Sequence, residues 1–143
     1  AQMAAIAILA ALVKKQTTGL GAEIDISMTD GALSWLAMPA AAALAGDVRE
    51  RGDVDLAGKW VCYMPYEAAD GWVSCGALEP KFWKALCVGA DREDLIAKQF
   101  ELAGSEGHAE IAELFRSRTR AEWAAFNDEH DCCIEPVLGI DER

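Results

Sequence analysis

The fold of this chain is decided by the stretch from Trp60 to Trp83, which reads WVCYMPYEAADGWVSCGALEPKFW. Its side chains alternate between two faces from Cys62 to Glu67, which is the period of a strand. The Asp70-Gly71 pair is typical of a tight hairpin turn, and the return strand is expected to run out at Leu78-Glu79. Pro80 can then begin a helix, because its φ is already set and it has no N–H to leave unpaired. The stretch therefore predicts a β-hairpin followed directly by a helix.

Glu79 stands between the return strand and the helix that Pro80 begins. The N-terminus of a helix favours a negative charge, so the carboxylate is expected to be ionised. It could orient a histidine brought by another segment or subunit, as the acid of a catalytic triad does. The alternative is that Glu79 caps its own helix, although Glu is not among the preferred capping residues. Residue chemistry alone favours the capping role.

The chain before this stretch predicts two apolar helices and a strand. Residues Met3 to Val13 are apolar on every face, which indicates a helix that protein covers all round. We expect a first helix over about 2–16, a short alternating strand over 22–27 and a second helix over about 30–44. Thr29 is the expected N-cap of the second helix, and Pro39 is expected to kink it.

The chain after this stretch predicts charged helices and a last strand. The helices are expected at about 91–101, 105–116 and 120–127, and the strand at 133–138. The third helix begins with a capping box, in which Thr119 and Glu122 would satisfy each other's backbone N–H groups. The expected fold class is α+β.

The composition restricts the possible classes of function. The chain has 143 residues, 52% of them hydrophobic, and a formal net charge of −11. This charge argues against binding to nucleic acid or to an anionic membrane, and Met3 to Val13 is shorter than the ~20 apolar residues that a membrane span needs. The five cysteines form no C-x-x-C pair. This pattern favours reduced thiols in a cytoplasmic protein.

Residues Asp128 to Cys133, DEHDCC, contain the side-chain types of a metal site. Ligands adjacent in sequence rarely converge on one ion, and no second His or Cys pair lies at ligand spacing. We therefore expect no metal. His130 fits better at a helix end, where a cation suits the dipole, and His108 is expected on an exposed helix. Cys132 and Cys133 lack a neighbouring base that would activate a nucleophile.

Several motifs, in chain order, resemble those of the family III CoA-transferases. Residues 21–31, GAEIDISMTDG, are similar to the family's G-x-x-I/V-D-x-x-M-x-D/E-G segment, and residues 51–58, RGDVDLAG, to its R-G-x-x-x-L-x-G linker. Residues 76–83, GALEPKFW, match the start of the family's helix after the hairpin, and residues 131–138, DCCIEPVL, are similar to its D-x-C-x-x-P-V-L strand. The acid at Glu79 is closer to the racemase-like branch of the family.

The resemblance implies how the chain is divided. Residues 1–46 would be the end of a Rossmann-like large domain, built as helix, strand and helix. Residues 47–59 would be a linker, and residues 60–143 a small α+β domain with a β-hairpin and several helices. In the family two chains interlock, and the active site lies between the large domain of one and the small domain of the other. A homodimer is therefore expected.

The resemblance also implies which residues form the site. Glu79 falls on the acidic catalytic position of the racemase-like branch, while Tyr63 and Leu78 would bind substrate, with Tyr63 lining the acyl-thioester channel. Coenzyme A would enter as the thioester substrate, with no separate cofactor. Its polyanionic nucleotide end needs Arg, Lys or helix N-termini. This chain clusters arginines only within residues 116–120, so we expect that end to be held elsewhere.

The family's catalytic aspartate precedes its first apolar helix, and these 143 residues contain no counterpart. The resemblance therefore implies a central portion of an enzyme that acts on acyl-CoA thioesters, by racemisation at the α carbon or by CoA transfer. We expect this portion to be inactive alone. The alternative is a non-enzymatic binding or assembly module, a dimer that buries its apolar helices against a second copy.

Overall fold

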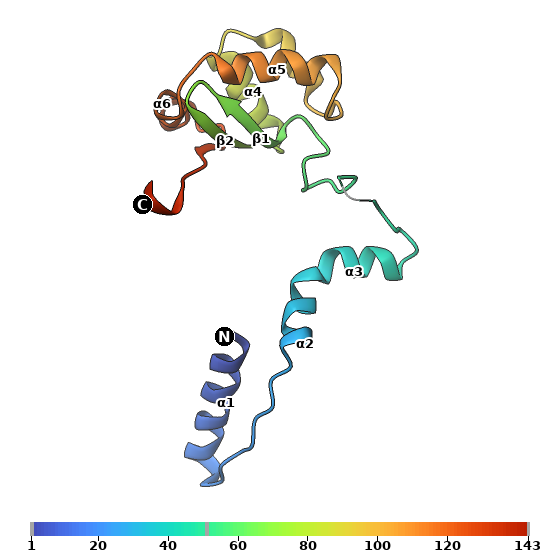
Figure 1. Ribbon diagram of the computed structural model, residues 1–143, viewed down its shortest axis with the longest axis vertical. Helices are drawn as coiled ribbons and strands as arrows, with labels where there is room; N and C mark the ends of the chain where they lie inside the picture. The colour runs from blue at the N-terminus through green and yellow to red at the C-terminus, as the bar shows by residue number, and fades with distance from the viewer. Residues whose placement is uncertain (1, 51, 143) are drawn as a thin grey trace. The chain divides into compact units, whose positions relative to one another are not determined.

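The computed structural model describes residues 2–50 and 52–142, and the chain separates into two units, Ala1–Val48 and Arg49–Arg143 (Figure 1). The boundary between them falls within residues 47–59, where the sequence predicts a linker. Among the described residues there are six α-helices, three 3-10 helices and three strands. The α+β class predicted from the sequence is confirmed.

The sheet of the second unit has three antiparallel strands in the order β1-β2-β3. The strands are β1 (Tyr63–Ala68), β2 (Gly71–Gly76) and β3 (Ile134–Pro136). β1 and β2 form the predicted hairpin, and the residues between them, Ala69 and Asp70, make its turn. The predicted continuation of β2 to Leu78-Glu79 is wrong. The N–H of Leu78 donates to the carbonyl of Gly76 at 2.9 Å, which turns the chain away from the sheet.

The helices of the second unit are α4 (Pro80–Gly89), η2 (Glu93–Lys98), α5 (Glu106–Arg116), α6 (Arg120–His130) and η3 (Ile140–Glu142). Pro80 occupies the first turn of α4, as predicted. The capping box of α6 is also confirmed, because Thr119 Oγ1 accepts from the N–H of Glu122 and the Glu122 carboxylate accepts from the N–H of Thr119. Local chemistry thus determines where α4 and α6 begin.

The helix predicted over 91–101 is present only in part, as the 3-10 helix η2 over Glu93–Lys98. The indole N–H of Trp83 in α4 lies 3.1 Å from the carbonyl of Leu95 and 3.2 Å from that of Ile96. Both carbonyls therefore accept a hydrogen bond from a side chain of α4. The last strand is likewise shorter than the predicted 133–138, since β3 pairs with β2 only over Ile134–Pro136.

The core of the second unit lies between the sheet and the helices α4, α5 and α6 (Figure 1). The inner face of the sheet contributes the buried side chains of Tyr66, Ala68, Val73, Cys75 and Ile134. The ring of Tyr66 is stacked on that of Phe115 with 4.4 Å between centroids, and Phe115 packs on Trp123 at 4.8 Å. Tyr66 donates its hydroxyl to the carbonyl of Val61 at 2.7 Å, so its polar atom is satisfied inside the core.

The first unit contains α1 (Gln2–Thr18), α2 (Met28–Leu33), η1 (Ser34–Leu36) and α3 (Ala37–Leu44). The helix predicted over 30–44 is thus interrupted by η1. Pro39, which has no N–H to donate, lies in the first turn of α3 just after this interruption, and the predicted kink stays a prediction. The predicted N-cap is wrong, since Ser27, and not Thr29, accepts from the N–H of Asp30, at 3.1 Å.

The strand predicted over 22–27 is wrong, because these residues form no regular element. A strand needs a neighbouring strand to accept and donate its backbone hydrogen bonds, and no sheet lies within the described part of the first unit. The Rossmann-like character of this unit therefore stays a prediction.

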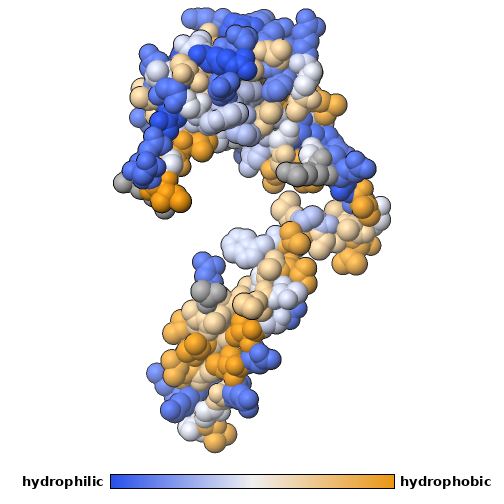
Figure 2. All heavy atoms as spheres, viewed as in Figure 1, coloured by the Kyte–Doolittle hydropathy of each residue, from blue (hydrophilic) through white to orange (hydrophobic). Residues whose placement is uncertain are grey.

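The described helices of the first unit have no buried residue. Figure 2 shows apolar side chains over the surface of α1, α2 and α3, among them Ile6, Leu9 and Val13, each 62% exposed. Over residues 2–50 and 52–142, no helix combines the length and hydropathy that crossing a membrane requires.

Candidate functional site

Glu79 is the N-cap residue of α4, with extended backbone dihedrals of φ −75° and ψ 137°. Its backbone carbonyl accepts from the N–H groups of Phe82 and Trp83, but its side chain accepts no capping hydrogen bond. The alternative in which this side chain caps its own helix is therefore wrong. The carboxylate is instead exposed at the N-terminus of α4, where it can meet another molecule.

A cavity of ≈ 360 Å³ lies beside the hairpin, and we call it the hairpin cavity. Its lining residues are Leu56, Ala57, Gly58, Tyr63, Met64, Pro65, Ser74, Cys75, Gly76 and Cys133. No side chain among them carries a full charge at neutral pH, and two are glycines, so the cavity suits an uncharged and largely apolar group.

The structure brings Tyr63 to this cavity but not Leu78. Tyr63 is the first residue of β1 and pairs with Gly76 across the hairpin. Leu78 instead packs against the core, and its carbonyl accepts from Nε2 of Gln99 at 2.8 Å. The predicted substrate contact of Leu78 therefore has no counterpart in the lining of the hairpin cavity.

Gln99 is a positioning residue that the sequence did not reveal. It is the buried polar side chain of the core, 7% exposed. Its Nε2 donates to the carbonyls of both Ala77 and Leu78, the two residues before Glu79. A buried amide that pairs with backbone carbonyls is costly to remove, so Gln99 holds the turn that presents Glu79.

Cys133 was considered from the sequence only as a nucleophile, and its place in the wall of a cavity was not predicted. It lines the hairpin cavity, has a left-handed φ of 58°, and accepts from the N–H of Gly76 at 2.8 Å through its carbonyl. Burial raises the pKa of its thiol, and the charges of Asp131 and Glu79 raise it further. The charge of Glu79 therefore acts at the hairpin cavity. The D-x-C pattern at residues 131–133 was the sequence feature that could have identified Cys133.

The other four cysteines lie inside the core. Burial raises the pKa of Cys62 to about 11, and the pKa values of Cys75, Cys87 and Cys132 to about 12. These thiols are therefore protonated near neutral pH and poor nucleophiles. Cys133 is the half-buried cysteine of the chain, and it lines the hairpin cavity together with the buried Cys75.

The histidines lie away from the hairpin cavity. His108 Nδ1 accepts from the N–H of Gly104 at 3.0 Å, and the ring of His130 lies 4.3 Å from that of Phe126 at the end of α6. In the part of the chain that the structure describes, no group of three or more His, Cys, Asp or Glu side chains has the geometry to hold a metal ion.

Sequence comparison links the chain to CoA-thioester enzymes. Residues 1–143 match the family model described as CoA-transferase family III. The chain is 30% identical to the alpha-methylacyl-CoA racemase of Mus musculus and 31% identical to that of Homo sapiens, over 98% of this chain and 38% of each relative. It is 28% identical to the CaiB/baiF CoA-transferase family protein ZK892.4 of Caenorhabditis elegans, over 97% of this chain and 41% of that protein.

Solved structures share the fold. The crystal structure of Rv3272, a hypothetical protein from Mycobacterium tuberculosis, superposes with a TM-score of 0.75 at 22% identity, over 98% of this chain and 38% of that chain. Its orthorhombic form gives a TM-score of 0.71 at 24% identity, over 96% of this chain and 37% of that one. The chain spans about 38% of the length of the racemases that it matches. With a family match over residues 1–143, the chain belongs to CoA-transferase family III.

Proposed function

We propose that this chain forms part of an enzyme that acts on acyl-CoA thioesters, and that the hairpin cavity contacts the acyl-thioester end of the substrate. The family and the uncharged lining of the cavity support this proposal. A thioester carbonyl and a branched hydrocarbon carry no charge, so they can enter an apolar cavity without the desolvation cost of an ion.

The observation that carries the proposal is the uncapped, exposed carboxylate of Glu79 at the N-terminus of α4, three residues along the chain from Gly76 in the cavity lining. It caps no helix, it is exposed, and its charge acts on Cys133 in the cavity wall. In the proposed chemistry one base removes the proton α to the thioester carbonyl. A second group then returns a proton to the opposite face. Glu79 would orient and charge-stabilise the histidine that acts as one of these groups.

The nucleotide end of coenzyme A would be held outside this chain. Arg116 makes ion pairs with Glu67 and Glu113, and Arg120 makes one with Glu142. These two guanidinium groups are already neutralised by carboxylates, which leaves only Arg118 of the cluster for a polyanionic pyrophosphate. We expect coenzyme A to bind as a substrate, with no further cofactor.

The reaction needs more than these residues supply. Racemisation requires a second acid–base group, and CoA transfer requires a carboxylate that attacks the acyl-CoA and forms a mixed anhydride. The resemblance assigns an aspartate to these steps that is absent from the 143 residues. We therefore expect residues 1–143 to bind thioesters without turning them over.

Cys133 offers a direct test of the proposal. Iodoacetamide should alkylate it before the four buried cysteines, and an α-methyl-branched acyl-CoA should slow this alkylation in a saturable way while free CoA protects less. Tyr63→Ala should weaken the protection, and Trp72→Ala, an exposed change on β2 outside the cavity lining, should not. An alkylation rate that no acyl-CoA changes would contradict the proposal. Deuterium uptake at the α carbon in heavy water, followed in the same samples, would contradict the expected inactivity.

A second candidate function is an assembly module, and the exposed apolar side chains of the first unit favour it. None of the described residues of α1, α2 and α3 is buried, and such a surface in a monomer promotes association. A homodimer would cover it. Light scattering should then give a mass of at least two chains, and a monodisperse monomer at tens of micromolar protein would contradict this candidate.

A further inference from the structure

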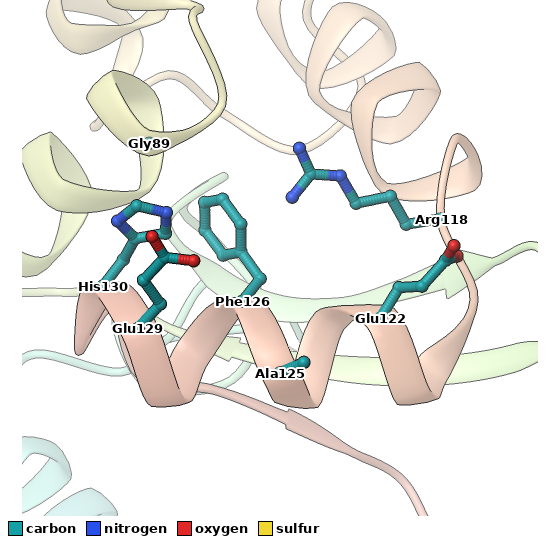
Figure 3. A pocket seen from close by; sticks show the side chains of 7 residues that line it. All are labelled: Gly89, Arg118, Glu122, Ala125, Phe126, Glu129 and His130. Atoms are coloured by element: carbon teal, nitrogen blue, oxygen red, sulfur yellow. The ribbon is translucent and has the colours of Figure 1, made fainter.

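The second unit contains another cavity, whose lining includes neither Glu79 nor Tyr63. It has a volume of ≈ 590 Å³ and lies against α6 and the last residue of α4, Gly89. We call it the α6 cavity. Figure 3 shows Phe126 and Ala125 rising from α6, His130 beside Phe126, and Arg118 reaching over Phe126 from the loop before the helix.

Arg118 is held firmly but makes no ion pair. Its carbonyl accepts from the N–H of Ala69 at 2.9 Å. Its guanidinium carbon lies 4.6 Å from the centroid of Phe126 and 4.9 Å from that of Trp123. Both rings belong to α6 and lie 5.2 Å apart, so they contact the guanidinium from one side and take up none of its N–H groups.

The other arginines that the structure describes differ in this respect. Arg49, Arg92, Arg116 and Arg120 each make an ion pair with a carboxylate. Within residues 2–50 and 52–142, Arg118 alone has neither an ion pair nor a hydrogen bond from its guanidinium to protein. A stacked guanidinium with open N–H edges in a cavity is suited to bind a planar oxyanion with two parallel hydrogen bonds.

The charges around the cavity select a singly charged ligand. Glu122 lines it, but its carboxylate accepts from the N–H and the hydroxyl of Thr119, both at 2.8 Å, and is occupied in capping α6. Glu129 lies at the exposed side. The two nearby carboxylates and the net charge of −11 repel a ligand in proportion to its negative charge. Phosphate esters and nucleotides are therefore disfavoured more strongly than a ligand with one carboxylate.

The remaining surface of the cavity suits a hydrocarbon or aromatic group. Phe126 and Ala125 supply an apolar floor, and the ring of His130 closes one side against Gly89, where a Cβ would come within 2.8 Å of that ring. The volume is in the range of ~300–1,000 Å³ that small-molecule sites occupy. There is space for a body of several carbon atoms beside the carboxylate.

We propose that the α6 cavity binds a small organic monocarboxylate. Its carboxylate pairs with Arg118, and its hydrocarbon or aromatic part lies on Phe126 and Ala125. This site shares no residue with the hairpin cavity. It is therefore independent of the proposed thioester chemistry.

The test uses the 143-residue chain and para-fluorobenzoate, whose fluorine NMR line broadens on binding. We expect saturable binding that Arg118→Gln weakens at least ~10-fold. Arg118→Lys keeps the positive charge but loses the two parallel N–H donors of the guanidinium, so it should weaken binding as well. The matched control is Arg116→Gln, a nearby arginine outside the cavity, which should change the affinity less than ~2-fold.

Arg118 packs on core rings, so Arg118→Gln could lose binding because the chain no longer folds. A second variant distinguishes this from a loss of the binding site. Ala125→Phe fills the exposed floor of the cavity and leaves Arg118 in place, so it should also block binding, with an unchanged near-ultraviolet circular dichroism spectrum. The proposal is overturned if para-fluorobenzoate shows no saturable binding, or if it binds Ala125→Phe as well as the unmodified chain. Equal losses of affinity for para-fluorobenzoate in Arg116→Gln and Arg118→Gln would overturn the proposal as well. So would inorganic phosphate that displaces para-fluorobenzoate as strongly as unlabelled benzoate does.

Discussion

Arg120 and Glu142 form a two-point ion pair, with Nη2 to Oε1 at 2.7 Å and Nη1 to Oε2 at 2.9 Å. Arg120 is the first residue of α6, and its backbone N–H also donates to Asp70 in the hairpin turn at 2.7 Å. One residue therefore joins the hairpin turn, the start of α6 and the 3-10 helix η3. Beyond β3, Arg120 also donates to the carbonyl of Val137 at 3.2 Å, so it contacts residues 137–142 at both ends.

The first prediction concerns the acid sensitivity of this ion pair. The hydrogen bonds from Arg120 lower the pKa of Glu142 from its ordinary 4.5 to about 2. A carboxyl group whose folded pKa is lowered stabilises the fold above its unfolded pKa, and this contribution is lost as the pH falls through the folded value. We expect the amide signals of residues 139–142 to keep their folded shifts down to about pH 4.5 and to change towards pH 2.

Arg120→Gln supplies the control for this titration. Without the guanidinium, the pKa of Glu142 should rise towards its ordinary 4.5, with the N–H of Gly139 still lowering it, and carbon-detected NMR follows this titration. A Glu142 pKa of about 4.5 in the unmodified chain would contradict the ion pair.

The second prediction concerns the electrostatic link between Glu79 and Cys133. Because the charge of Glu79 is one cause of the raised pKa of Cys133, Glu79→Gln should lower that pKa. Thiolate is the reactive form, so alkylation of Cys133 should become faster at a given pH and its profile should move to lower pH. Lys81→Met should move the alkylation profile of Cys133 to higher pH, since the charge of Lys81 lowers this pKa.

The matched control for this experiment is Glu93→Gln, an exposed change at the start of η2. It should leave the alkylation profile unchanged, because Glu93 is not among the charges that act on Cys133. Identical profiles for Glu79→Gln and Glu93→Gln would mean that Glu79 does not influence the hairpin cavity.

The third prediction separates the stability of the two units. Phe115 is fully buried and stacked on Tyr66, so Phe115→Ala should lower the free energy of unfolding by ~3–5 kcal/mol. Leu9 on α1 is 62% exposed, and Leu9→Ala should change the stability of the second unit by less than ~0.5 kcal/mol. Urea denaturation followed by tryptophan fluorescence measures both, and similar losses from the two variants would contradict this difference.

The fourth prediction concerns Gln99. In Gln99→Leu the carbonyls of Ala77 and Leu78 lose their amide donor, which should cost ~1–3 kcal/mol. Hydrogen exchange at Phe82 and Trp83 should accelerate, because their N–H groups bond to the carbonyl of Glu79 in the turn that Gln99 holds. Gln16→Leu, on the exposed end of α1, is the control, and unchanged exchange in Gln99→Leu would show that the turn holds without the amide.

Part of the fold could be predicted because it depends on neighbouring residues alone. Pro80 begins α4, and the Thr119–Glu122 capping box begins α6, since both effects act within one helical turn. The strand predicted over 22–27 failed for the opposite reason. An alternating pattern becomes a strand only beside another strand, and the described part of the first unit contains none.

The sequence by itself determined the hairpin, the starts of α4 and α6 and the family, because turn chemistry, capping and ordered motifs are local in the chain. Only the tertiary structure decided which side chains meet. Cys133 joins Tyr63 in one cavity, Gln99 reaches the turn before Glu79, and Arg118 lies over aromatic rings without a carboxylate. The first two of these contacts join residues far apart in sequence. They form only when the core packs, and spacing along the chain does not encode them.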